Sequence, residues 1–188
     1  MSADIPRLEF EELTPELQDV FRARVERLGY LGEFFKVMAH APETMGGFHT
    51  ITESLKQALP DNFTEIVSLS LSSRLGNRYE QYQNERLSQK LGFSDQWIAE
   101  ALNPVDGPDG GPDSVFSIEE KAVQAFAIAV MERKGQGVEA ERDAVVTAIG
   151  PQQTVAIMWL VGRTVTHALI SNTLELEAPV ASIFGQQS

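Results

Sequence analysis

The apolar residues of this chain recur mainly at helical spacing, and the segments between them carry residues that start and end helices. Thr14-Pro15 is a typical helix start, because a threonine hydroxyl can cap free backbone amides and a proline at the first helical position gives up no hydrogen bond. Ser117 and Glu120 have the spacing of a capping box. The pattern predicts an all-α protein with helices over residues 15–28, 31–39, 43–59, 61–75, 77–91, 94–102, 117–134, 139–149 and 150–174.

Two segments interrupt this helical pattern. Residues 66–72 alternate between apolar residues and serine, as a strand would, but we expect a helix that Asp61 caps, because no second strand is predicted nearby. Residues 103–115 are rich in Pro, Gly and Asp and have too few apolar side chains to pack, which predicts a flexible loop. No repeat divides the remainder, so we expect residues 1–188 to form a single domain.

The amino-acid composition of the chain excludes several classes of function. The chain has 188 residues, 43% of them hydrophobic, which is enough to bury a core. It contains no cysteine, which excludes a thiolate nucleophile and a thiol peroxidase. The net charge of −12 argues against nucleic acid and anionic membranes as partners. The N-terminus does not resemble a signal peptide and no run of about 18 apolar residues is present, so we expect a cytoplasmic protein without a membrane segment.

The last predicted helix is apolar on nearly every side over residues 155–170, so we expect it to be buried in the domain or at a contact between subunits. Arg163 and His167 lie four residues apart on this helix, between aliphatic neighbours. A buried arginine normally needs a carboxylate or a bound anion. The pair is therefore interpreted either as a structural ion pair with Glu65 or Glu80, or as a binding site for an anionic substrate.

Residues 77–91 form a polar helix whose apolar side is marked only by Leu87 and Leu91. Asn84 and Glu80 lie on the same stripe, at successive steps of three or four residues before these leucines. We therefore expect the inward face of this helix to carry an amide and a carboxylate.

Fixed offsets connect this helix to the one before it. Counting from Glu65, Asn77 lies 12 residues later, Tyr79 14, Glu80 15 and Asn84 19. This spacing resembles the signature of the carboxymuconolactone decarboxylase and AhpD-like alkylhydroperoxidase superfamily. There a Glu is followed at these positions by Cys, Tyr, Cys and His, or by Tyr-Glu and His in a cysteine-free branch. Here the Glu and the Tyr-Glu pair match, whereas Asn84 stands in place of the histidine.

The resemblance implies an AhpD-like bundle of about 8–9 helices that assembles as a homo-oligomer, a trimer or hexamer. It also implies acid/base catalysis without a cofactor, with Glu65 and Glu80 as acid and base, because two carboxylates in one apolar cleft cannot both ionise cheaply. Three dispersed histidines without ligand spacing predict no metal site. The candidate catalytic residues are Glu65, Tyr79, Glu80 and Asn84, and the candidate substrate-binding residues are Asn77, Arg163 and His167.

The same residues also have structural interpretations. Glu65 can favour the positive end of a helix dipole, Glu80 with Tyr79 can form a hydrogen-bond cluster, and Asn84 can be a buried amide with all its hydrogen bonds made.

Three functions follow. We favour an acid/base enzyme of decarboxylase, lyase or isomerase type that acts on a small organic acid or lactone. The alternative is a non-catalytic AhpD-like protein for binding or assembly, because Asn84 cannot shuttle a proton near neutral pH. Peroxidase activity is suggested by the resemblance alone, and the lack of cysteine argues against it.

Overall fold

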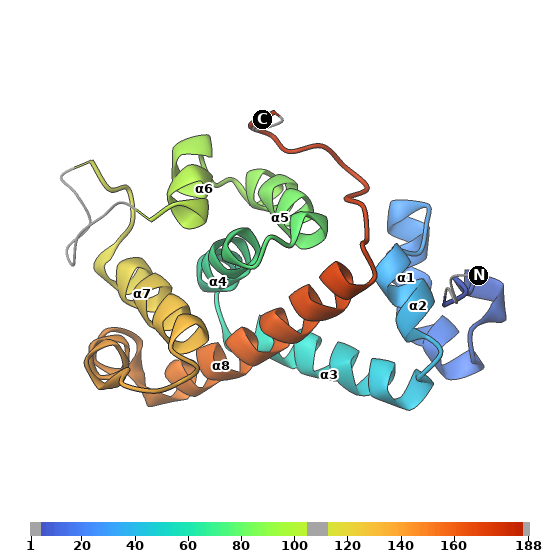
Figure 1. Cartoon of the computed structure of the whole chain (residues 1–188), viewed down its shortest axis with the longest axis horizontal. Helices are drawn as coiled ribbons and strands as arrows, with labels where there is room; N and C mark the ends of the chain where they lie inside the picture. The colour runs from blue at the N-terminus through green and yellow to red at the C-terminus, as the bar shows by residue number, and fades with distance from the viewer. Residues whose placement is uncertain (1–4, 105–112, 186–188) are drawn as a thin grey trace. The chain divides into compact units, whose positions relative to one another are not determined.

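The protein is described here by a computed structural model that covers residues 5–104 and 113–185. All regular secondary structure in these residues is helical, which confirms the prediction of an all-α protein (Figure 1). The loop predicted over residues 103–115 falls largely outside the described residues. The helices are η1 (Phe10–Glu12), α1 (Pro15–Leu28), α2 (Glu33–Met38), α3 (Pro42–Ala58), α4 (Asp61–Arg74), α5 (Arg78–Leu91), α6 (Asp95–Leu102), α7 (Ile118–Glu132) and α8 (Glu139–Thr173).

The contacts of the chain fall into two compact units, Met1–Glu53 and Ser54–Ser188. The first unit has an aromatic centre, in which the rings of Phe21 and Phe35 lie 4.9 Å apart and those of Phe34 and Phe48 lie 5.7 Å apart. The second unit carries the candidate site. The single domain expected from the sequence stays a prediction.

In the second unit, α4 lies at the centre and contacts α5, α6, α7 and α8 (Figure 1). Because other helices surround it, α4 buries both its apolar residues and its serines. Ile66 and Leu69 are fully buried, and the Ser70 hydroxyl donates a hydrogen bond to the backbone oxygen of Ala101 at 2.7 Å. The strand-like alternation of residues 66–72 therefore belongs to a helix that has no exposed side.

Most of the helix ends lie close to the predicted bounds. Gly29 and Gly92 end α1 and α5 with positive φ angles of 78° and 94°. The side chain of Ser94 accepts a hydrogen bond from a first-turn amide of α6, and Ser117 with Glu120 forms the predicted capping box of α7. The prediction that Asp61 caps α4 is wrong. Asp61 is the first helical residue and Pro60 occupies the cap position, so Asp61 contributes its charge to the first turn instead.

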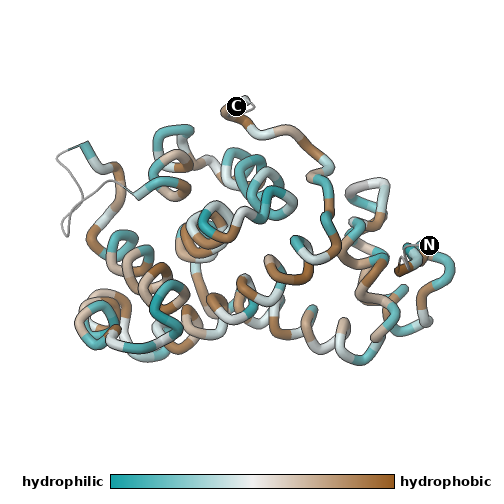
Figure 2. The backbone as a smooth tube through the Cα atoms, viewed as in Figure 1, coloured by the Kyte–Doolittle hydropathy of each residue, from teal (hydrophilic) through white to brown (hydrophobic). Residues whose placement is uncertain are grey.

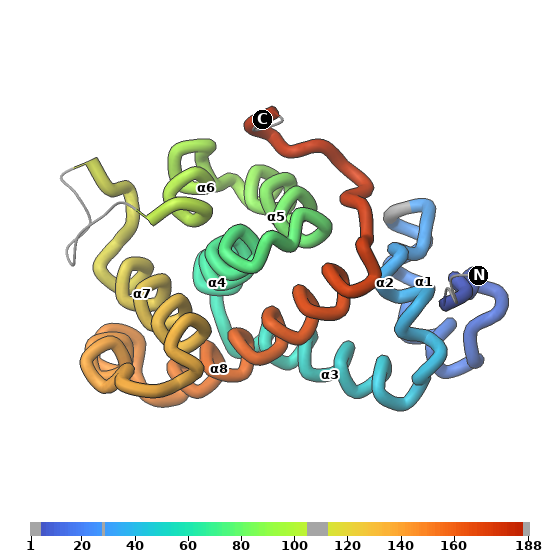
Figure 3. Tube along the Cα trace, viewed as in Figure 1, coloured from blue at the N-terminus to red at the C-terminus, as the bar shows by residue number. Residues whose placement is uncertain are grey.

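The helix α8 changes direction along its length (Figure 3). The kink lies at Gly150, whose φ of 79° and ψ of 166° are not helical. The following Pro151 begins a new helical stretch, as the sequence predicts. Apolar and weakly polar residues cover most of α8, whereas α5 is mainly hydrophilic (Figure 2). By length and composition alone, α8 is the one helix of residues 5–104 and 113–185 that is able to cross a membrane, and the buried helix of a soluble protein passes the same test.

The burial of α8 is one-sided in the single chain. Ile157, Leu160 and Val161 pack into the core. On the opposite side, Trp159 is 61% exposed and Leu169 is 59% exposed. The expectation that α8 is buried therefore holds for one face within the unit.

Candidate functional site

Asn77 and Glu80 fix the start of α5. The side-chain oxygen of Asn77 accepts a hydrogen bond from the backbone amide of Glu80 at 3.3 Å, which makes Asn77 the N-cap. The amide nitrogen of Asn77 also donates to the Glu80 carboxylate at 3.4 Å. Asn77 is fully buried and Glu80 is 7% exposed, so the cap holds the carboxylate inside the protein.

The Glu80 carboxylate lies against two residues of α8. Arg163 Nη1 donates to Glu80 Oε1 at 2.5 Å, and His167 Nδ1 lies 3.1 Å from Glu80 Oε2. The ring of Tyr79 stacks on His167 with 6.1 Å between ring centres. Of the two interpretations of Arg163 and His167, the structure therefore describes the ion pair with a core acidic residue.

These contacts decide the protonation state of Glu80. Burial alone would raise the pKa of this carboxyl, but the charges and hydrogen bonds of His167 and Arg163 outweigh it and lower the pKa to about 2. Glu80 is therefore an ionised hydrogen-bond acceptor at neutral pH.

Glu65 lies in the second turn of α4 and behaves in the opposite way. It is 6% exposed, and the Ser88 hydroxyl of α5 donates to its Oε2 at 3.1 Å. Burial raises its pKa, the Ser88 hydrogen bond lowers it, and the negative charge of Glu80 raises it further, to about 7. This carboxyl gains and loses a proton near neutral pH.

Asn84 lies one helical turn after Glu80 and one turn before Ser88 on α5. Its amide nitrogen Nδ2 is buried and has no hydrogen-bond partner among the described residues. A buried donor without a partner costs about 1–3 kcal/mol. The interpretation of Asn84 as a satisfied buried amide is therefore wrong for this nitrogen.

The predicted apolar side of α5 is also wrong. Leu87 and Leu91 are 40% and 41% exposed, whereas Glu85 and Ser88 are fully buried. Polar side chains can face inward here because each finds a partner on another segment, Ser88 on Glu65 and Glu85 on the C-terminal tail. Ser88 was missed by the sequence analysis, although it continues the four-residue spacing of Glu80 and Asn84.

The two buried carboxyls therefore differ in their protonation at neutral pH. Glu65 can accept or donate a proton near neutral pH, and Glu80 stays ionised within its cluster. Within the described part of the chain, no group of three or more His, Asp and Glu side chains is placed to hold a metal ion.

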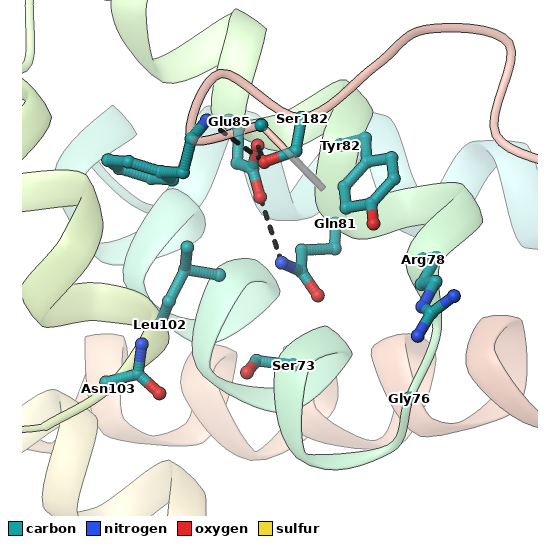
Figure 4. Close-up of a pocket in the computed structure, with 11 residues that line it drawn as sticks. Ser73, Gly76, Arg78, Gln81, Tyr82, Glu85, Leu102, Asn103 and Ser182 are labelled. Atoms are coloured by element: carbon teal, nitrogen blue, oxygen red, sulfur yellow. Dashed lines mark hydrogen bonds between the residues drawn. The ribbon is translucent and has the colours of Figure 1, made fainter. Parts of the chain in front are cut away.

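A cavity of about 250 Å³ is lined by residues of α4, α5, α6 and the C-terminal tail (Figure 4). The residues that line it include Arg78, Gln81, Tyr82 and Glu85, none of which the sequence singles out as a site residue. Neither Glu65 nor Glu80 lines it.

Similarity to known proteins is found in structure and not in sequence. No known protein-family model matches the chain. No curated protein matches its sequence.

Three solved structures are similar along nearly the whole chain. The debrominase Bmp8, in a complex of its cysteine-to-alanine variant with 2,3,4-tribromopyrrole, has a TM-score of 0.78 at 15% identity, over 96% of this chain and 94% of that one. An uncharacterised peroxidase-related protein from Ralstonia eutropha JMP134, described as an alkylhydroperoxidase AhpD core, has a TM-score of 0.77 at 14% identity, over 94% of both chains. A peroxidase-related protein from Silicibacter sp. TM1040 has a TM-score of 0.76 at 15% identity, over 93% of this chain and 90% of that one.

The chain therefore has the AhpD-like helical fold, as the spacing of its motif predicts. At 14–15% identity the likeness shows a common fold, and the chemistry has to be argued from the residues.

Proposed function

We propose that this protein is a cofactor-free acid/base enzyme that moves a proton on a small organic acid or lactone, with Glu65 as the group that carries the proton. The observation that supports this function is the pKa of about 7 at a buried carboxyl in the motif. A proton-transfer group works best when its pKa lies near the working pH, because both of its forms are then populated. Ionised Glu65 takes the proton from the substrate carbon, and protonated Glu65 returns it to the product.

Glu80 has a different part in this proposal from the one the spacing suggests. With a pKa of about 2 it cannot donate a proton at neutral pH, so it is not the second member of an acid/base pair. Its negative charge holds Arg163 and His167 in place and contributes to the raised pKa of Glu65. Glu80, Arg163 and His167 are therefore positioning residues.

Asn84 completes the proposed site. Removal of a proton next to a carbonyl group leaves negative charge on the carbonyl oxygen, which a preorganised donor stabilises. The buried Asn84 Nδ2 has no partner among the described residues, so it can donate to such an oxygen without breaking another hydrogen bond. An amide suits this task although it cannot relay protons as a histidine does.

The similar structures give no reason to propose a thiol-dependent step for this chain. The debrominase complex carries a cysteine-to-alanine replacement, and two other similar structures are described as peroxidase-related. This chain contains no cysteine, so a step that needs a thiol of the protein is not available to it.

Exchange of carbon-bound hydrogen for deuterium tests the proposal without knowledge of the full reaction. A panel of small keto acids, unsaturated acids and lactones is incubated in deuterium oxide with the wild type, with Glu65→Gln and with Glu139→Gln, and deuterium incorporation is followed by NMR. Glu139 is an exposed glutamate at the start of α8 and serves as the matched control.

We expect the wild type and Glu139→Gln to exchange at least one panel member at equal rates, and Glu65→Gln to lose at least about 100-fold in rate. Equal exchange by wild type and Glu65→Gln would contradict the assignment of Glu65.

The second candidate is a non-catalytic protein that binds a ligand or assembles with copies of itself. The replacement of the expected histidine by Asn84 favours it, because the motif then lacks its usual proton relay. Wild-type protein that binds panel members and exchanges none of them would support this candidate.

We also propose that the protein is a cytoplasmic homo-oligomer, a trimer or hexamer, with small molecules as its other partners. The exposed side chains of Trp159 and Leu169 on α8 support a contact between subunits on that face.

A further inference from the structure

The cavity of about 250 Å³ beside α5 has a defined wall on the side of the C-terminal tail (Figure 4). Glu85 is fully buried and accepts hydrogen bonds from the Ser182 hydroxyl at 2.7 Å and from the backbone amide of Ile183 at 3.0 Å. Arg86 donates to the backbone oxygen of Ala181 at 3.1 Å. The tail is therefore tied to α5 at consecutive residues and closes one side of the cavity.

Gln81 presents an acceptor to the cavity. Its amide nitrogen donates to Glu85 Oε1 at 2.9 Å, and a carboxylate can only accept, so the nitrogen must be the atom on that side. Figure 4 shows the Gln81 amide oxygen pointing away from Glu85, into the space between Ser73 and Arg78. A ligand in this space therefore meets an amide oxygen, with the negative charge of Glu85 behind it.

Arg78 contributes a positively charged hydrogen-bond donor to the same cavity. It is an exposed residue at the start of α5, and it lines both this cavity and a larger groove of about 710 Å³ along the tail. No carboxylate of the described residues lies within ion-pair distance of its guanidinium, in contrast to Arg163 in the Glu80 cluster. Arg78 is thus available to a carboxylate, which a guanidinium binds with charge-assisted hydrogen bonds.

We propose that this cavity binds a small carboxylic acid that also carries an amino or hydroxyl group. The ligand carboxylate pairs with Arg78, and its amino or hydroxyl hydrogen is donated to the Gln81 amide oxygen. The apolar part of the ligand contacts Leu102 and Phe184, which line the same cavity. Glu85 behind Gln81 favours the amino form through its charge. The volume of about 250 Å³ leaves room for a small acid of this kind.

Three small carboxylic acids test which functional groups the cavity binds. L-valine, α-hydroxyisovalerate and isovalerate share a carbon skeleton and differ in carrying an ammonium group, a hydroxyl group or neither. Their binding to the full chain is measured by calorimetry or ligand-observed NMR, on wild type, Arg78→Gln and Arg22→Gln. Arg22 is an exposed arginine of α1 in the other compact unit and controls for the loss of one charge.

We expect L-valine or α-hydroxyisovalerate to bind wild type and Arg22→Gln equally, and isovalerate to bind at least about tenfold more weakly. Arg78→Gln should lose at least about tenfold in affinity with an unchanged melting temperature, because its side chain is exposed.

Three outcomes would overturn the proposal: no binding of any of the three acids, equal binding of all three, or equal binding by wild type and Arg78→Gln. A stronger response to L-valine than to α-hydroxyisovalerate identifies an amino acid as the ligand, and the reverse order identifies a hydroxy acid. The outcome does not depend on proton transfer at Glu65, because Glu65 does not line this cavity.

Discussion

Two glutamates of one motif have pKa values that move in opposite directions, and their partners explain why. Both are almost completely buried. Glu80 has an arginine and a histidine of α8 as partners, whereas Glu65 has only a hydroxyl group as its hydrogen-bond donor among the described contacts. Burial favours the neutral form of a carboxyl unless a cation compensates for the lost hydration. The side chains that contact each glutamate therefore decide which of the two carries a proton at neutral pH.

The stability of the protein should report the raised pKa of Glu65. Below pH 4.5 this carboxyl is protonated in both the folded and the unfolded chain. Between pH 4.5 and about 7 the unfolded chain loses the proton while the folded chain keeps it, so the free energy of unfolding falls as the pH rises. Over that window Glu65 should cost the folded state about 3 kcal/mol in total.

Urea unfolding of wild type and Glu65→Gln at pH 4.5 and pH 8 measures this cost. We expect Glu65→Gln to gain about 3 kcal/mol over wild type between the two pH values. An equal difference at both pH values would show that the pKa of Glu65 is not raised. Glu80 acts in the opposite sense, because its contribution is present above pH 4.5 and is lost as the pH falls through about 2.

Replacement of Asn84 should stabilise the free protein. Leucine has a similar volume and no polar atom, so Asn84→Leu removes the buried donor that has no partner among the described residues. We expect the free energy of unfolding to rise by about 1–3 kcal/mol while catalysis or ligand binding at Glu65 is lost. Thermal unfolding and the deuterium-exchange assay measure the two effects. A loss of stability in Asn84→Leu would mean that this nitrogen is satisfied in solution.

Among the helices, most boundaries could be predicted from the sequence because the residues that cap helices act locally. Thr14-Pro15, Gly92 and the pair Ser117 and Glu120 act on backbone groups within a few residues, so the sequence alone contains the relevant partners. The same reason explains the correct prediction of a helix start at Gly150-Pro151.

The inward face of α5 could not be predicted in this way. Glu85 is buried because its partner Ser182 lies 97 residues further along the chain, and Glu80 is buried beside Arg163, 83 residues away. A pattern that counts apolar residues assigns the inside to Leu87 and Leu91, which are exposed in the single chain. The motif spacing located Glu65 and Glu80, but only the packing of α4, α5 and α8 separates their protonation states.

Gly150 permits the change of direction within α8. Its φ of 79° and ψ of 166° lie in a region that is essentially restricted to glycine. We expect Gly150→Ala to lower the free energy of unfolding by about 1–3 kcal/mol. Gly47→Ala in α3 is the control, because Gly47 lies inside a helix without a positive φ and, as at Gly150, the added methyl group meets no side chain or distant backbone atom within 4 Å.

The control should be neutral or stabilising by about 0.5–1 kcal/mol, since alanine is the better helix former. Urea unfolding of the three proteins compares them. If both substitutions stabilised the protein, the two parts of α8 would form one continuous helix.

The fold of the whole molecule is shared by proteins that are described by different activities. Structures of a debrominase and of a peroxidase-related protein have this arrangement of helices at 14–15% identity. This chain has no cysteine. The fold supplies the positions of α4, α5 and α8, and the residues at those positions determine the reaction.

The exposed apolar face of α8 should hold copies of the chain together. Trp159, 61% exposed in the single chain, is a large aromatic residue of the type that dominates subunit contacts. We expect wild type to be a trimer or hexamer by light scattering, and Trp159→Glu to shift toward the monomer because it places a charge in the contact. Gln136→Glu adds the same charge at an exposed polar position in the turn before α8, outside this helical face, and should leave the assembly unchanged. A monomeric wild type would contradict the proposed assembly.

The protonation of Glu65 is the central claim, and carboxyl-detected NMR of glutamate-labelled protein measures it directly. Comparison of wild type with Glu65→Gln assigns the side-chain carboxyl signal, which is then followed from pH 4 to pH 9. We predict a single titration with a pKa of about 7, together with a Glu80 carboxyl that stays ionised throughout. A Glu65 signal that titrates near its ordinary value of 4.5 would contradict the proposal that this residue carries a proton in the reaction.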